Sequence, residues 1–121
     1  MKLRILGNSI RLRLTQTEVS DLAQLGKVSE ITQFGSDDFL EYELSMTTDT
    51  ELIVSFQQGK ILVALPEVIG KPWANGAAVS LQRFIRTDEK SELSVLIEKD
   101  FKCKTERAGE NEDDMFPNPD C

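Results

Sequence analysis

The first fourteen residues constrain the fold more than any other segment of the chain. Leucine and isoleucine alternate with basic residues on both sides of Gly7-Asn8. Strict alternation is typical of a half-buried strand, and a Gly-Asn pair between two such runs predicts a two-residue turn in which the glycine takes a positive φ. The chain is therefore predicted to open with a β-hairpin that buries one of its faces.

The predicted register gives this hairpin a cationic face. With Gly7-Asn8 in the turn, Arg4 lies opposite Arg11, and the apolar residues share the other face. Like charges directly opposite each other destabilise an antiparallel pair, so we expect an anionic group on this face. The sequence does not decide whether that group belongs to the protein or to a ligand. The candidate anion-binding residues are Lys2, Arg4, Arg11 and Arg13.

Further elements follow from local patterns. A capping box at residues 15–18 predicts the start of a short helix, which Gly26 ends. A second hairpin is predicted around Gln58-Gly59, with Phe56 opposite Ile61. Strands are expected over residues 27–34, 39–46, 78–86 and 92–101. The segment 66–75 contains Gly70 and Pro72 and is expected to form a turn or one helical turn, with Trp73 in the core.

Together these elements predict an α+β fold in one domain, residues 1–103. We expect a mostly antiparallel sheet of about seven strands with one short capped helix, in an arrangement that could close partly into a barrel. No internal repeat is evident. The outward face of the second hairpin is unusually apolar, so we expect a helix, the tail or a second subunit to cover it, in a monomer or a homodimer. Its residues are Ile53, Ser55, Leu62 and Ala64.

Residues 104–121 form an acidic tail that is predicted to be largely disordered. This tail carries much of the net charge of −7. Because nucleic-acid binding depends on positive charge near the phosphates, a chain with this net charge is not expected to bind nucleic acid. Alternatively, residues 112–117 fold back, so that their carboxylates lie on the cationic face and Phe116 lies on the apolar outward face of the second hairpin. The two cysteines, Cys103 and Cys121, fit free thiols in a reducing cytoplasm. No segment is apolar enough to predict a membrane span.

The residue types argue against most enzyme classes. The chain has no histidine, which removes the commonest general base and the commonest metal ligand. No phosphate-binding loop, zinc spacing or calcium loop is present, so no cofactor is expected. Glu41 and Glu43 share one face of a predicted strand and are the only magnesium candidates. A second interpretation is that they neutralise Arg4 and Arg11. We expect a non-enzymatic binding module for an anionic ligand or a protein partner.

Two resemblances keep other functions open. Glu41 and Glu43 with the N-terminal arginines resemble the triphosphate tunnel family, whose barrels line their interior with Glu, Lys and Arg. That resemblance implies a magnesium-dependent polyphosphate or nucleotide hydrolase, although Ser45 stands where the family motif has lysine. Residues 7–28 are similar to the swapped-hairpin fold of bacterial transition-state regulators and antitoxins, which implies a DNA-binding dimer.

A third resemblance spans the chain. Residues 1–14, 98–103 and 110–119 resemble a group of short, uncharacterised bacterial proteins that share the N-terminal hairpin, an EKDF-x-C segment and an acidic FPNP tail. This resemblance implies a stand-alone bacterial protein and carries no activity with it.

Overall fold

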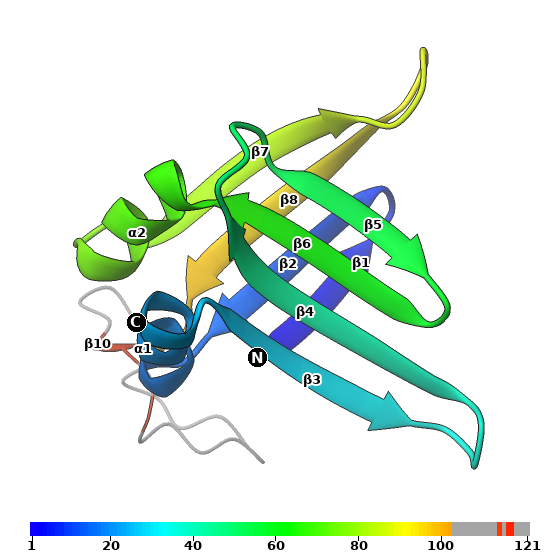
Figure 1. Cartoon of the computed structure of the whole chain (residues 1–121), viewed down its shortest axis with the longest axis horizontal. Coiled ribbons are helices and arrows are strands. Elements are labelled where there is room, and N and C mark those ends of the chain that lie inside the picture. Colours follow the sequence, from blue (N-terminus) through cyan, green and yellow to red (C-terminus); the bar gives the residue numbers. More distant parts are fainter. Residues whose placement is uncertain (103–113, 115, 118–121) are drawn as a thin grey trace.

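The computed structural model describes residues 1–102, 114, 116 and 117, and eight of the described strands form two four-stranded sheets (Figure 1). In each sheet the two outer pairs are antiparallel and the central pair is parallel. The first sheet consists, in spatial order, of β1 (Lys2–Leu6), β2 (Ser9–Leu14), β8 (Glu92–Lys99) and β7 (Ser80–Arg86). The second consists of β3 (Lys27–Gln33), β4 (Phe39–Thr47), β6 (Lys60–Pro66) and β5 (Ile53–Gln57).

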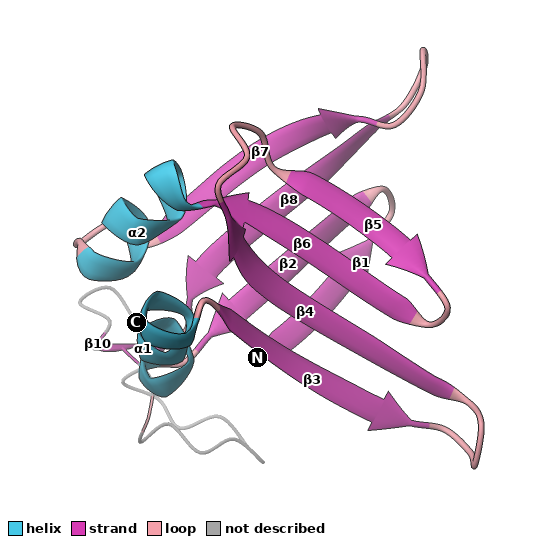
Figure 2. Ribbon diagram, in the orientation of Figure 1, coloured by secondary structure: helices cyan, strands magenta, loops and turns pink. Residues whose placement is uncertain are grey.

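Two helices, α1 (Gln16–Leu25) and α2 (Glu67–Asn75), lie at one end of the sheets, and the hairpin turns extend toward the other end (Figure 2). The short strands β9 (Phe101–Lys102) and β10 (Phe116–Pro117) pair in parallel. The predicted capping box of α1 is confirmed, because the Thr15 hydroxyl accepts from the Glu18 amide and the Glu18 carboxylate accepts from the Thr15 amide. Gly26 ends α1 with φ of 85°, the left-handed region that glycine adopts without strain.

The topology contains an internal repeat that the sequence does not reveal. The order strand, strand, helix, strand, strand occurs twice, in β1 to β4 and again in β5 to β8. Each sheet combines one hairpin from each half. The registers agree as well: Ser9 pairs with Ser94 in the first sheet at the place where Lys60 pairs with Glu41 in the second. The two halves are therefore related by an approximate two-fold axis, and equivalent positions can be compared directly.

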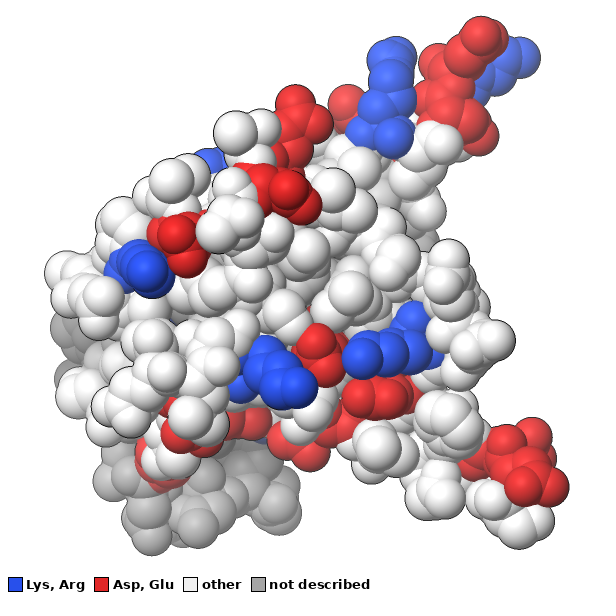
Figure 3. All heavy atoms as spheres, in the orientation of Figure 1, with Lys and Arg blue, Asp and Glu red and all other residues white. Residues whose placement is uncertain are grey.

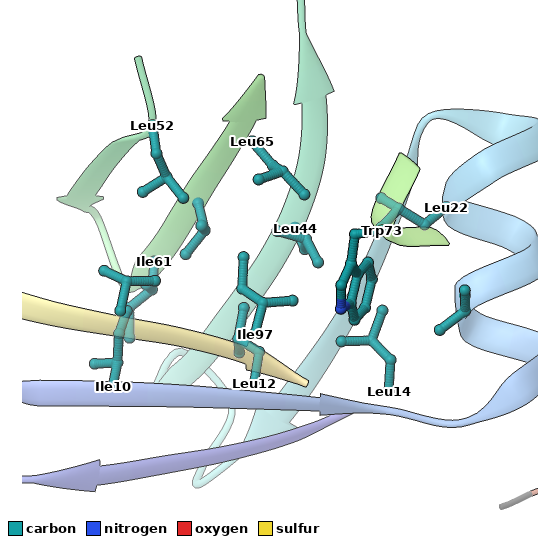
Figure 4. Close-up of a cluster of buried hydrophobic side chains, with 13 residues drawn as sticks. Ile10, Leu12, Leu14, Leu22, Leu44, Leu52, Ile61, Leu65, Trp73 and Ile97 are labelled. Atoms are coloured by element: carbon teal, nitrogen blue, oxygen red, sulfur yellow. The ribbon is translucent and has the colours of Figure 1, made fainter. Parts of the chain in front are cut away.

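The core lies between the inner faces of the two sheets and extends under both helices (Figure 4). Trp73, predicted to be in the core, is only 3% exposed, and its indole Nε1 donates to the carbonyl oxygen of Val79 at 3.3 Å. Burying one large apolar side chain contributes about 1.5–3 kcal/mol, so this layer is the main stabilising term. Its fully buried side chains include Leu12, Leu14, Leu22, Leu44, Val63, Leu65 and Ile97.

The α+β class is confirmed, but the predicted sheet is wrong. In the described part of the chain there are two mixed sheets of four strands each and two helices in place of one antiparallel sheet of about seven strands with one helix, and neither sheet closes into a barrel. The error has a physical cause. The parallel pairs β2–β8 and β4–β6 join strands that are not consecutive in the sequence, and no local pattern specifies such a pairing.

The expected turn at residues 66–75 is the helix α2, in which Pro72 is internal. Packing against the second sheet stabilises this helix. A side chain at Gly70 would place its Cβ 2.6 Å from the Met46 sulfur, so glycine is what lets α2 approach β4 closely. Together with the burial of Trp73, this contact outweighs the local preference of proline against a helix interior.

Both predicted hairpins are confirmed in register. Arg4 lies opposite Arg11 and Phe56 opposite Ile61, and Gly7 has the expected positive φ of 55°. The outward face of the second hairpin is not covered by any described element, and Ile53 on it is 51% exposed. None of the described helices combines the length and apolar character needed to cross a membrane.

The predicted tail, residues 104–121, lies outside the described residues except for Asp114, Phe116 and Pro117, and both cysteines also lie outside them. The Asp114 carbonyl accepts from the Gln16 amide at 2.9 Å, and its carboxylate accepts from Thr17 at 3.0 Å. The Phe116 ring lies 5.5 Å from that of Phe101. These described tail residues therefore contact the start of α1 and β9. The fold-back alternative placed the carboxylates on the cationic face and Phe116 on the apolar outward face of the second hairpin.

Candidate functional site

The first sheet brings the four predicted anion-binding residues together on its outward face. Arg4 lies opposite Arg11 and Lys2 opposite Arg13 in the antiparallel pair of β1 with β2. Alternation along β2 buries the leucines on either side of Arg13 and turns the basic side chains away from the core. We call the outward side of β1 and β2 the cationic face.

Two carboxylates of the protein partly neutralise this face. Arg13 Nε lies 2.9 Å and Arg11 Nε 3.4 Å from the same oxygen of Glu98, whose side chain is 16% exposed. The parallel pairing of β2 with β8 places Glu98 directly beside Arg13. Lys2 Nζ lies 3.0 Å from the carboxylate of Asp100, which is 1% exposed. Among the described residues, two carboxylates thus lie against the four cations of this face.

Arg4 differs from its three neighbours. It is exposed, and within the described residues no carboxylate oxygen lies within 4.0 Å of it. Arg4 and Arg11 line a small open pocket of about 110 Å³ together with Leu6 and Ser9. The Ser9 hydroxyl donates to the Leu6 carbonyl oxygen at 2.6 Å, so the guanidinium groups are the donors that this pocket offers. A single carboxylate or phosphate group matches it in size and charge.

The equivalent place on β5 and β6 is also hollow, with a volume of about 360 Å³. Here the positions of Arg4 and Arg11 are taken by Ser55 and Leu62, and that of Ser9 by Lys60. The backbone of the two halves therefore forms a depression beside each hairpin turn, and the outward side chains give each depression a different chemistry.

Glu41 and Glu43, the predicted magnesium candidates, lie on the outward face of the second sheet. Lys60 Nζ is 3.2 Å from a Glu43 oxygen and 3.7 Å from a Glu41 oxygen, and the Ser45 hydroxyl donates to Glu43. Burial raises the pKa of Glu43, but the hydrogen bonds from Ser45 and Lys60 outweigh burial, and the pKa is lowered. Figure 3 shows acidic and basic side chains intermingled in the middle of this face.

These carboxylates do not meet the arginines, because the two sets lie on outward faces of different sheets with the apolar core between them. The interpretation that Glu41 and Glu43 neutralise Arg4 and Arg11 is therefore wrong. The charged barrel interior implied by the triphosphate tunnel resemblance is not formed either. Among the described residues, no group of three or more acidic, cysteine or histidine side chains could hold a metal ion. Magnesium binding by the two glutamates stays a prediction.

Sequence reasoning missed Glu98 and Asp100, the carboxylates of the described residues that pair with the cationic face. Glu98 could be assigned to the outward side of its strand by alternation. Its partners could not be found, since they follow from the parallel pairing of β8 with β2. Only a pairing hypothesis that joined the two ends of the chain would have revealed this contact.

Comparison with known proteins assigns the chain to a family but indicates no activity. A family model described as a family of unknown function, DUF7009, matches residues 1–120. The chain belongs to this family. The expected resemblance to an uncharacterised group of short proteins is thereby confirmed. No curated protein and no solved structure gives a significant match. For this member of DUF7009, function has to be argued from the geometry of its surface.

Proposed function

We propose that this DUF7009 protein is a non-enzymatic binding module whose cationic face captures an oxyanion group of a partner. The observation that carries the proposal is the pocket lined by Arg4 and Arg11. An uncharacterised small domain is consistent with the family match, and a cytoplasmic location in a bacterium is part of the proposal.

The charge balance of the cationic face supports binding of an anion. Arg4 and Arg11 are directly opposite each other, an arrangement that destabilises an antiparallel pair unless negative charge lies nearby. Glu98 supplies that charge to Arg11 and Arg13, on the side away from Arg4. An oxyanion between Arg4 and Arg11 would relieve the remaining repulsion and accept charge-assisted hydrogen bonds from both guanidinium groups.

The site favours binding over chemistry. Its described lining consists of two guanidinium groups, one hydroxyl and a leucine, and none of these is a general base. The Ser9 hydroxyl donates within its own turn. Such a pocket fixes the position of an anionic group through charge and geometry, and recognition of the rest of the partner would come from the neighbouring strands.

An amide chemical-shift titration of the full chain with tripolyphosphate, with and without magnesium, tests this proposal. Saturable shifts confined to residues 2–14 are expected, and Arg4→Gln should weaken binding about tenfold because one of two charge-assisted contacts is lost. Lys90→Gln removes an equal charge from an exposed loop and is the matched control. The absence of saturable shifts at millimolar ligand, or equal loss in both variants, would reject a specific site.

The titration in the presence of magnesium distinguishes anion binding from a magnesium-dependent hydrolase. A response at Glu41 and Glu43 that appears only with magnesium would show a metal site on the second sheet, apart from the arginines. The same shifts with and without the metal would support simple anion binding at the cationic face.

A second candidate, DNA binding, is favoured by one observation. The order of elements in residues 7–28 is found twice, and each sheet exchanges hairpins between the two halves, as the swapped-hairpin resemblance would imply for a pair of such units. Titration with a short DNA duplex at several salt concentrations tests it. Binding through phosphates loses affinity steeply as salt rises, whereas no binding at low salt would exclude this candidate.

A further inference from the structure

A second site lies away from the cationic face, on the edge of the first sheet. An open pocket of about 450 Å³ is lined by residues 83–86 of β7, residues 50–52 of the β4–β5 loop, and Ile69 of α2. Figure 1 shows β7 passing the loop that joins β4 to β5. This volume falls within the range of about 300–1,000 Å³ typical of small-molecule sites.

The pocket combines an apolar wall with two basic side chains. Leu52 is buried, and Ile69 and Ile85 are half-buried, so together they provide apolar surface. Arg83 and Arg86 are exposed at its side. Arg83 Nη1 donates to the Gln82 carbonyl oxygen at 2.8 Å, which orients the guanidinium group. Within the described residues no carboxylate oxygen lies within 4.0 Å of either arginine.

Among the described residues, two carboxylates lie near the pocket. Glu51 is the carboxylate in the lining, on the loop side, and it makes no ion pair with Arg83 or Arg86. Thr50 adds a hydroxyl group beside it. The second carboxylate is that of Glu92, which lies directly opposite Arg86 in the register of β7 with β8. Arg83 lies opposite Val95 and makes no ion pair with a described residue, so it is the cation that this side of the pocket offers.

The two-fold repeat shows what the equivalent position does in the other half. Arg83, opposite Val95, corresponds to Glu30, opposite Tyr42. Glu30 lies 2.9 Å from the amino group of Met1, which also pairs with Glu18 on α1. In the first half, Glu30 on the edge strand β3 therefore binds the Met1 amino group, which lies between this strand and α1. In the second half the charge at this position is reversed, and the space beside it is open.

We propose that this second pocket binds a small organic oxyanion, with the anionic group on Arg83, Arg86 at the rim, and an apolar body on Leu52, Ile69 and Ile85. Arginine pairs carboxylates and phosphates through parallel N–H donors, and Arg83 lies on the same face of β7 as Ile85, beside the apolar wall. Phe84, 63% exposed at the rim, adds a surface on which a ring can pack. This inference does not depend on the function of the cationic face.

Titration of the isotope-labelled full chain with phenylacetate and with phenyl phosphate tests the proposal, with amide shifts of residues 50–52 and 83–86 as the readout. Saturable shifts in both segments are expected. Tighter binding of phenylacetate would assign carboxylic acids to the site, and tighter binding of phenyl phosphate would assign phosphate monoesters. The readout differs from that of the cationic face, so failure of one site leaves the other testable.

Two comparisons make the result specific. The double variant Arg83→Gln, Arg86→Gln should bind at least about tenfold more weakly, whereas Lys27→Gln, which removes a charge from the second sheet, should bind as the parent does. The neutral analogue 2-phenylethanol should also bind about tenfold more weakly. No saturation at millimolar probe, or equal affinity of parent and double variant, would overturn the proposal. The two arginines are exposed, so the double variant is expected to fold, which an unchanged amide spectrum would verify.

Discussion

The hairpins β1–β2 and β5–β6 have the same register and opposite surface chemistry. Ile10 and Ile61 occupy equivalent buried positions, as do Leu14 and Leu65. On the outward side, Arg11 in one hairpin corresponds to Leu62 in the other. The inward residues are restricted by packing between the sheets, whereas the outward residues are free to differ. The comparison teaches that the fold and the surface chemistry are encoded on alternate residues of the same strands.

The largest expected effect concerns the shared inward positions. Leu44 on β4 and Ile97 on β8 are equivalent by register, and both are fully buried. Leu44→Ala and Ile97→Ala should each lower the free energy of unfolding by about 2–5 kcal/mol, measured by urea denaturation. Val68→Ala, at a residue 70% exposed, is the control and should have little effect. A loss in only one of the two core variants would break the equivalence of the halves.

A smaller effect is expected where the halves differ, at Glu98. Replacing it by glutamine leaves Arg11 and Arg13 without their carboxylate, which should cost about 1–3 kcal/mol of stability because charged groups lose their partner. The same variant should bind tripolyphosphate more tightly, since the cationic face gains positive charge. Denaturation and titration of one preparation measure both. Glu92→Gln, at an exposed residue of the same strand, is the control, and unchanged affinity in Glu98→Gln would contradict the proposed site.

The smallest effect is expected at Glu43, on the outward face of the second sheet. The pKa of Glu43 is lowered in the folded protein, so its carboxylate stabilises the fold above its unfolded-state pKa, and this stabilisation is lost as the pH falls through the folded-state value. Glu43→Gln should therefore be less stable than the parent by about 0.5 kcal/mol at neutral pH, with the difference vanishing in acid. Urea denaturation across this pH range measures it. A difference that persists in acid would assign the loss to packing, and Glu89→Gln in an exposed loop is the control.

The sequence was sufficient wherever a feature depends on neighbours along the chain. The Gly7 turn, the Arg4–Arg11 pairing and the capping box at Thr15 are all local, and each is present as predicted. The cationic face follows from strand alternation alone. Its possible ligands remain a prediction, because nothing in alternation identifies a partner.

The rest depends on contacts between distant segments. Glu98 reaches Arg13 through a parallel pairing, and α2 persists past Pro72 because Trp73 and the close approach at Gly70 stabilise it. The two-fold repeat of the fold could not be predicted from the sequence for a related reason. Equivalent buried positions retain apolar character but not always identity: Ile10 and Ile61 are the same residue type, whereas Leu12 and Val63 differ.

The exchange of hairpins between the two halves also has a consequence for how the chain reaches its native state. Neither half has a complete sheet of its own, since β2 needs β8 and β4 needs β6. The first half leaving the ribosome would expose unpaired strands and an uncovered apolar layer until the last strand is synthesised. Such nonlocal pairing slows folding and extends the time during which aggregation can compete. Separately produced halves, by contrast, are each expected to be unfolded and to regain structure when mixed.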